Sequence, residues 1–204
     1  YMNGFGDHRI EGIGDKHIPW IHNVRNTDAV VAIDDEACMS LLRVFNEPEG
    51  KQFLAKQGLK EEFLAQLPLL GISGISNLLS AVKTAKYYEL NGKDLVFFPM
   101  TDSAGMYGSR LEELRAERGA FSGCLAGRHW DRYLQGAGTD YFRELSFRDR
   151  KALHNFKYYT WVEQQQRTME DLNQLWEPET WEEIFSQGPE IDRRIKEFNE
   201  LARG

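Results

Sequence analysis

Residues 94–118 constrain the fold most, because a short apolar run, a polar loop and a helical pattern follow one another there. Leu95–Phe98 has the length of a β-strand, and Pro99 ends it because proline cannot donate to a sheet ladder. Small polar residues fill the loop 101–105, and the apolar residues of 110–118 recur at helical period. Ligands of α/β proteins bind at the carboxyl ends of strands, so this loop is a candidate ligand site. The alternative is an ordinary turn between a strand and a helix.

A second apolar run, Asp28–Asp34, is apolar on both faces, as buried parallel strands are. Asp34 or Asp35 can cap a helix predicted over 36–46, although the acidic run 34–36 could instead bind a cation. About 60 residues of mostly helical pattern separate the two runs, so we predict neighbouring parallel strands of one sheet. The expected fold class is α/β: part of a three-layer α/β/α domain with parallel strands, followed by a helical C-terminal extension.

The turn Gly71–Ser76 precedes a helix predicted over 77–90. Free backbone N–H groups at the N-terminus of such a helix can receive an anion. The alternative is that Ser73 or Ser76 acts as a plain N-cap.

Residues 119–204 have a different character, because aromatic side chains alternate there with arginines and carboxylates at helical spacing. The sequence predicts an almost wholly helical region that packs its aromatic residues on the main domain or on another subunit. We therefore divide the chain into a domain at 1–118 and a helical extension at 119–204.

Composition excludes several classes of function. The net charge of −7 and a pI near 5.3 argue against a nucleic-acid partner. No apolar run approaches the roughly 18 residues of a membrane span. Two separated cysteines without a signal peptide indicate reduced thiols and a cytoplasmic location. The spacing of the histidines matches no zinc motif, and neither a P-loop nor a nucleophile elbow is present.

Three segments, in this order, resemble the fold type II pyridoxal-phosphate enzymes, the group that contains O-acetylserine sulfhydrylase (cysteine synthase). Residues 8–14 resemble the family's H-K-I-Q-G-I-G loop, and 18–19 and 34–37 resemble its following I-P and V-x-D-E-E-A elements. Residues 71–77 are similar to the G-I-S-S-G-A turn, with departures at its fourth and fifth positions. Residues 101–107 resemble the P-S-S-G-E-R-Y segment after the last core strand.

The resemblance implies a pyridoxal 5'-phosphate cofactor and a β-elimination or β-replacement reaction on an amino acid. It places Ser103 at the pyridine nitrogen of the cofactor and the backbone of Gly12 and Gly14 close to the cofactor. Asp102 would be the inward group if the register shifted by one residue. It also implies that residues 1–118 are the C-terminal half of a cofactor-binding domain. The family's Schiff-base lysine precedes the first matched segment, so we expect it upstream of Tyr1 and expect this chain alone to be inactive.

Two other interpretations remain. The chain could be a noncatalytic α/β domain with a helical oligomerisation extension, or a subunit that completes an active site carried by another chain. In the enzyme interpretation, we expect an amino-acid substrate, no nucleic-acid or membrane partner, and a homodimer or higher homo-oligomer.

Overall fold

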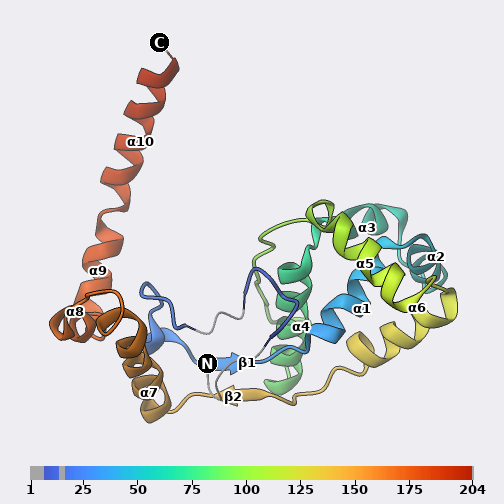
Figure 1. Cartoon of the computed structure of the whole chain (residues 1–204), viewed down its shortest axis with the longest axis horizontal. Helices are drawn as coiled ribbons and strands as arrows, with labels where there is room; N and C mark the ends of the chain where they lie inside the picture. Colours follow the sequence, from blue (N-terminus) through green and yellow to red (C-terminus); the bar gives the residue numbers. More distant parts are fainter. Residues whose placement is uncertain (1–6, 14–16, 204) are drawn as a thin grey trace. The chain divides into compact units, whose positions relative to one another are not determined.

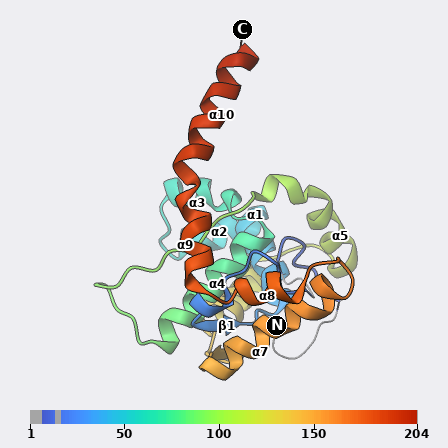
Figure 2. The ribbon, with the colours of Figure 1, turned by 90° about the vertical axis from the view of Figure 1, so that its left-hand side faces the viewer.

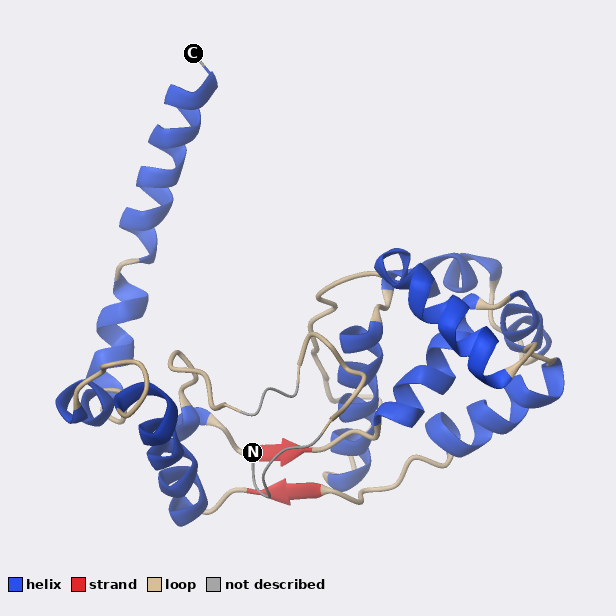
Figure 3. Ribbon diagram, in the orientation of Figure 1, coloured by secondary structure: helices blue, strands red, loops and turns tan. Residues whose placement is uncertain are grey.

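The computed structural model describes residues 7–13 and 17–203 and is helical over 64% of the chain (Figures 1 and 3). The chain separates into two compact units. Of the described residues, the first unit combines 17–28 with 144–203, and the second combines 7–13 with 29–143. Each unit is described by itself.

The second unit is built around helix α1 (Asp35–Asn46), whose residues from Ala37 to Phe45 are all buried. Asp34 caps this helix through a hydrogen bond from the backbone N–H of Glu36 to its Oδ1 at 2.9 Å, which confirms the predicted cap. The elements that pack against α1 are α2 (Pro48–Lys56), η2 (Leu67–Leu69), α4 (Ile72–Tyr87), α5 (Gly108–Arg118), α6 (Gly123–His129) and the π-helical turn η4 (Trp130–Gln135). The short helix α3 (Glu61–Gln66) and the 3-10 turn η3 (Ala104–Tyr107) complete the unit.

The predicted three-layer fold with parallel strands is wrong. The described part of the chain has one sheet of two strands, β1 (Ala29–Val31) and β2 (Phe142–Glu144), and they run antiparallel. The apolar run at 28–34 does contain a strand, but its partner comes from 142–144 instead of 95–98. Strand formation depends on an available partner as much as on local preference, and here only the later segment supplies one.

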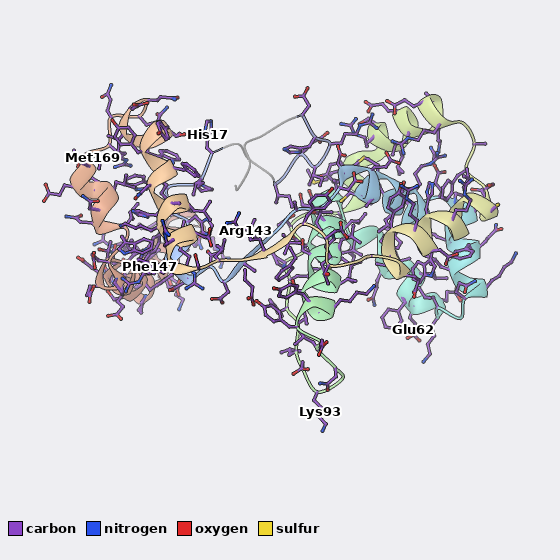
Figure 4. All side chains as sticks on the ribbon, turned by 90° about the horizontal axis from the view of Figure 1, so that it is seen from below. His17, Glu62, Lys93, Arg143, Phe147 and Met169 are labelled. Atoms are coloured by element: carbon purple, nitrogen blue, oxygen red, sulfur yellow. The ribbon has the colours of Figure 1, made fainter. Side chains whose placement is uncertain are left out.

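Leu95–Phe98, the second predicted strand, is an irregular segment of a loop whose tip carries Lys93 (Figure 4). The side chains of Leu95 and Phe97 are 90% and 92% exposed, whereas Phe98 packs against the core. No backbone hydrogen bond of residues 95–98 is made within the described ranges. The β-forming composition of this segment therefore has no strand beside it to pair with.

Apart from its loops and the end of β2, the first unit is helical. It contains the 3-10 turn η1 (Val24–Asn26), α7 (Phe147–Lys157), the π-helical turn η5 (Tyr158–Val162), α8 (Met169–Gln174), α9 (Pro178–Ser186) and α10 (Gly188–Arg203). Figure 2 shows α10 continuing beyond α9, and none of its described residues is buried.

Indole groups anchor this unit. Trp161 Nε1 donates to the carbonyl of Ile18 at 2.8 Å, and Trp181 Nε1 donates to the carbonyl of Leu175 at 2.9 Å. None of the four tryptophans of the predicted extension is exposed, as the aromatic pattern predicts. Several phenylalanine and tyrosine side chains are exposed there, among them Phe156 and Tyr159.

No single helix in the described ranges is long and apolar enough to cross a membrane, although one bent pair, Glu61–Leu69 with Ile72–Tyr87, passes by length and composition alone.

Candidate functional site

The three segments singled out in the sequence meet at the N-terminus of α4. The backbone N–H of Gly71, the N-cap of this helix, donates to the carbonyl of Asp102 at 3.1 Å. An ideal Cβ at Gly71 would lie 2.0 Å from Asp102 Oδ1. An ideal Cβ at Gly12 would lie 2.4 Å from Ser73 Oγ. Glycine at both positions therefore permits a close approach that no side chain allows.

Both flanking segments are fixed in place by further hydrogen bonds. Asn77 Nδ2 on α4 donates to the carbonyl of Pro99 at 2.9 Å and holds the start of the loop 99–105. The backbone N–H of Arg9 donates to Asp35 Oδ2 at 2.9 Å and ties the loop 7–13 to the first turn of α1. The loop 7–13, the start of α4 and the loop 99–105 thus form a polar cluster from segments that are far apart in the sequence.

The prediction that Ser73 or Ser76 caps α4 is wrong, because the helix begins earlier, at Ile72, with Gly71 as its N-cap. Both serines lie inside the first turns and are buried. Glycine has no side chain to satisfy the free N–H groups of the first turn, so these donors remain available to other partners.

Two buried polar atoms of the cluster have no hydrogen-bond partner among the described residues. They are Ser73 Oγ, on a side chain 1% exposed, and Asp102 Oδ1. Buried polar atoms almost always have a hydrogen-bond partner in folded proteins, so two such atoms without a partner close to Gly71 need an explanation.

The other carboxylate oxygen of Asp102 is occupied. Oδ2 accepts a hydrogen bond from the hydroxyl of Tyr107. Burial raises the pKa of Tyr107 to about 12, and this hydrogen bond to Asp102 adds to the shift because it stabilises the protonated phenol. Tyr107 therefore stays a neutral donor at physiological pH and fixes the orientation of the carboxylate.

The predicted cofactor contacts fall as follows. Gly12 lies in the cluster, against Ser73. Ser103 is half-buried at the N-cap position of η3 and makes no capping hydrogen bond. Gly14 lies outside the described residues. The structure adds Ser73 and Asp102 as residues whose buried polar atoms have no partner among the described residues. In the sequence, each was marked by its position inside the second or third matched segment.

The acidic run at 34–36 is engaged in the fold. Asp34 caps α1, Asp35 accepts from Arg9, and Glu36 binds both terminal nitrogens of Arg118 at 2.6 and 2.8 Å. No group of three or more potential metal ligands occurs in the part of the chain that the structure describes. The cation-binding alternative thus has no supporting geometry there.

Comparison with known proteins finds no match among protein-family models, curated protein sequences or solved structures.

Proposed function

We propose that this chain is the C-terminal part of a pyridoxal-phosphate-dependent enzyme that catalyses β-elimination or β-replacement on an amino acid. The observation that carries the proposal is the meeting of three segments at the N-terminus of α4. Each of them resembles a segment that surrounds the cofactor in the fold type II enzymes. They lie up to 100 residues apart in the sequence, yet Gly12 contacts Ser73 and Gly71 contacts Asp102.

The residues present fit such a cofactor in one respect. A polar ring needs buried hydrogen-bonding groups, and Ser73 Oγ and Asp102 Oδ1 are buried without partners among the described residues. Gly12 and Gly71 let the backbone lie against these two atoms, because a Cβ would lie 2.4 Å from Ser73 Oγ and 2.0 Å from Asp102 Oδ1.

The role proposed for each group follows from its position. When bound, the cofactor supplies the electron sink for a carbanion at the substrate α-carbon. The segment 101–105 presents an acceptor to the ring nitrogen, at Ser103 by the resemblance or at the adjacent Asp102. The Gly71 end of α4 offers free N–H groups, which suit an anionic group of cofactor or substrate.

We propose that the lysine that links the cofactor to the protein lies outside this cluster. The lysines of the second half of α4 are engaged elsewhere: Lys83 Nζ pairs with Asp140 Oδ2 at 3.0 Å, and Lys86 Nζ donates to the carbonyl of Gln135 at 3.0 Å. The resemblance assigns the Schiff-base lysine to chain that precedes the first segment.

The test is an assay on the full translation product of the gene that encodes these residues. O-acetylserine and O-phosphoserine are supplied with and without sulfide, and pyruvate, ammonia and cysteine are measured. The proposal expects formation of one of these products, dependent on added or bound pyridoxal phosphate. A protein that releases none of them from either substrate, with or without the cofactor, contradicts it and favours a noncatalytic domain.

We further propose that α10 mediates association with a second copy of the chain. Ile191, Ile195 and Phe198 repeat at helical spacing and are 49%, 52% and 68% exposed. Arg193 and Glu190 form an ion pair among the charged residues of the same helix. One apolar stripe beside a charged surface is the pattern of a helix that buries its stripe against another helix.

A further inference from the structure

The side chains of the segment Leu95–Phe98 alternate between solvent and the protein. Leu95 is 90% exposed and Phe97 is 92% exposed. Between and after them, Val96 is only 38% exposed and Phe98 packs against the core. Alternation of side chains between two sides is the pattern of an extended chain. The segment therefore has the side-chain arrangement of a β-strand, although it belongs to no sheet among the described residues.

The backbone of this segment has hydrogen-bonding capacity to spare. Among the described residues, no backbone N–H or C=O group of 95–98 makes a hydrogen bond. The chain is nevertheless held on both sides. The N–H of Asp94 donates to the carbonyl of Asn91 at 3.0 Å, and the carbonyl of Pro99 accepts from Asn77 Nδ2 at 2.9 Å. An extended, unpaired segment held at both ends is a template to which another strand can add.

The same segment in a second copy of the chain is complementary to it. A two-fold axis at Val96 sets Leu95 of each copy opposite Phe97 of the other in an antiparallel pair. The two most exposed apolar side chains of the segment then contact each other as cross-strand pairs. A register shifted by one residue would set an outward side chain opposite an inward one, such as Phe98.

The charged residues that precede the segment favour the antiparallel direction. In a parallel pair, Lys93 would lie beside Lys93 of the second copy and Asp94 beside Asp94, and like charges opposite each other destabilise a strand pair. In the antiparallel pair centred on Val96, Lys93 lies opposite Pro99 and Asp94 opposite Phe98. Pro99 also ends the pairing, because it has no N–H to donate.

We infer that Leu95–Phe98 is an interaction surface that pairs, antiparallel and centred on Val96, with the same segment of a second copy. This surface is separate from the one proposed on α10, and it does not depend on the cofactor. It supplies backbone hydrogen bonds and two apolar cross-strand pairs. Because so short a strand pair buries little area, the association is weak and forms only at concentrations above the micromolar range.

Sedimentation equilibrium of the full translation product tests this inference. The background protein carries Ile195→Glu, so that association through α10 does not contribute, and it should dimerise as its concentration rises. Leu95→Lys and Phe97→Asp should each raise the dissociation constant roughly tenfold, because each sets two charges against apolar side chains. The matched control is Phe63→Asp, since Phe63 is 62% exposed on α3, and it should leave the dissociation constant unchanged.

A mixture of the two charged variants tests the register. In the mixed dimer, the ammonium introduced at position 95 of one copy faces the carboxylate introduced at position 97 of the other. The second pair of the same dimer keeps Leu95 opposite Phe97. The mixture should therefore associate within about threefold of the background protein, although each variant alone does not. A parallel pair, or an antiparallel pair in another register, gives no such recovery.

Several outcomes would overturn the inference. A background protein that stays monomeric at every concentration does so, including when another part of the translation product covers the segment. So does a dimer that neither charged variant weakens, a dimer that Phe63→Asp weakens equally, or a mixture that associates no better than its components. Both substituted side chains are at least 90% exposed, so the variants should fold, and circular dichroism melting curves verify this.

Discussion

Gly50 of α2 packs directly on the backbone of Val44 in α1. An ideal Cβ at position 50 would lie 2.2 Å from the carbonyl oxygen of Val44 and 2.7 Å from its carbonyl carbon. Both partners are buried, so neither helix can yield without disturbing the core of the second unit. The absence of a side chain at this one position sets how closely the two helices approach.

Gly50→Ala should therefore destabilise the protein although alanine favours helices. The expected loss in the free energy of unfolding is about 2 kcal/mol, since the clash is with backbone and cannot be relieved by a rotamer change. Urea unfolding followed by circular dichroism measures it. Gly92→Ala is the matched control, because nothing lies within 4 Å of a Cβ there, and it should leave the stability nearly unchanged.

A buried ion-pair network crosses the same unit. Glu47, 4% exposed, binds Arg43 at 3.2 Å and Arg115 at 3.0 Å, and Arg43 also donates to the carbonyl of Gly119 at 2.9 Å. Glu47→Gln should cost about 3 kcal/mol of unfolding free energy, because the guanidinium of Arg43 is left buried without its counter-charge.

The control for this substitution is Glu190→Gln. Glu190 pairs with Arg193 and Arg194, but all three side chains are about half exposed or more. Exposed pairs contribute little, so the control should leave the stability nearly unchanged. Equal losses in the two variants would contradict the assignment of Glu47 as a core residue.

His154 should make the stability of the first unit depend on pH. Its side chain is 1% exposed, and burial, with Lys157 and Lys151 adding repulsion, lowers its pKa from 6.5 to about 4. Between those values the unfolded chain binds a proton that the folded one does not, so stability rises as pH increases from about 4 to about 6.5. The expected gain in the free energy of unfolding over this pH range is about 2–3 kcal/mol.

Thermal unfolding at a series of pH values tests this behaviour. His154→Gln keeps a side-chain donor for the carbonyl of Leu172, which His154 contacts at 2.9 Å. In that variant the dependence of stability on pH between pH 4 and 6.5 should be weaker by the contribution of one titrating group. An unchanged slope would show that His154 is not the group responsible.

Association through α10 is tested by sedimentation equilibrium. Ile195→Glu places a charge in the middle of the exposed stripe and should shift the protein to monomer at micromolar concentration. Lys196→Glu, one position along the helix and off the stripe 191–195–198, changes the charge more but should leave the assembly intact. A wild-type protein that is monomeric at all concentrations would contradict the proposed self-association.

The sequence predicted a helix and its cap better than it predicted which strands pair with each other. The cap at Asp34 and the helix that follows were predicted correctly, because capping depends on neighbouring residues only. The strand predicted at 95–98 does not form, because strand formation needs a partner that local sequence does not reveal. The antiparallel pairing of 29–31 with 142–144 joins segments more than 100 residues apart and had no sequence signal.

The candidate site shows the same limit. The three segments were recognisable from their residues, but which side chain faces α4 was not. The contact of Asp102 with Gly71 includes one main-chain hydrogen bond between segments about 30 residues apart, which local sequence does not reveal.

The cofactor content of the purified full translation product tests the central claim most directly. Pyridoxal phosphate released by acid is measured per chain in the wild type, in Gly71→Ala and in the control Gly108→Ala, where nothing lies within 4 Å of a Cβ. We predict about one cofactor per chain in the wild type and in Gly108→Ala, and a large loss in Gly71→Ala, because its methyl group displaces the carboxylate of Asp102. A wild type without cofactor, or a Gly71→Ala protein that retains all of it, would contradict the placement of a pyridoxal-phosphate site at the N-terminus of α4.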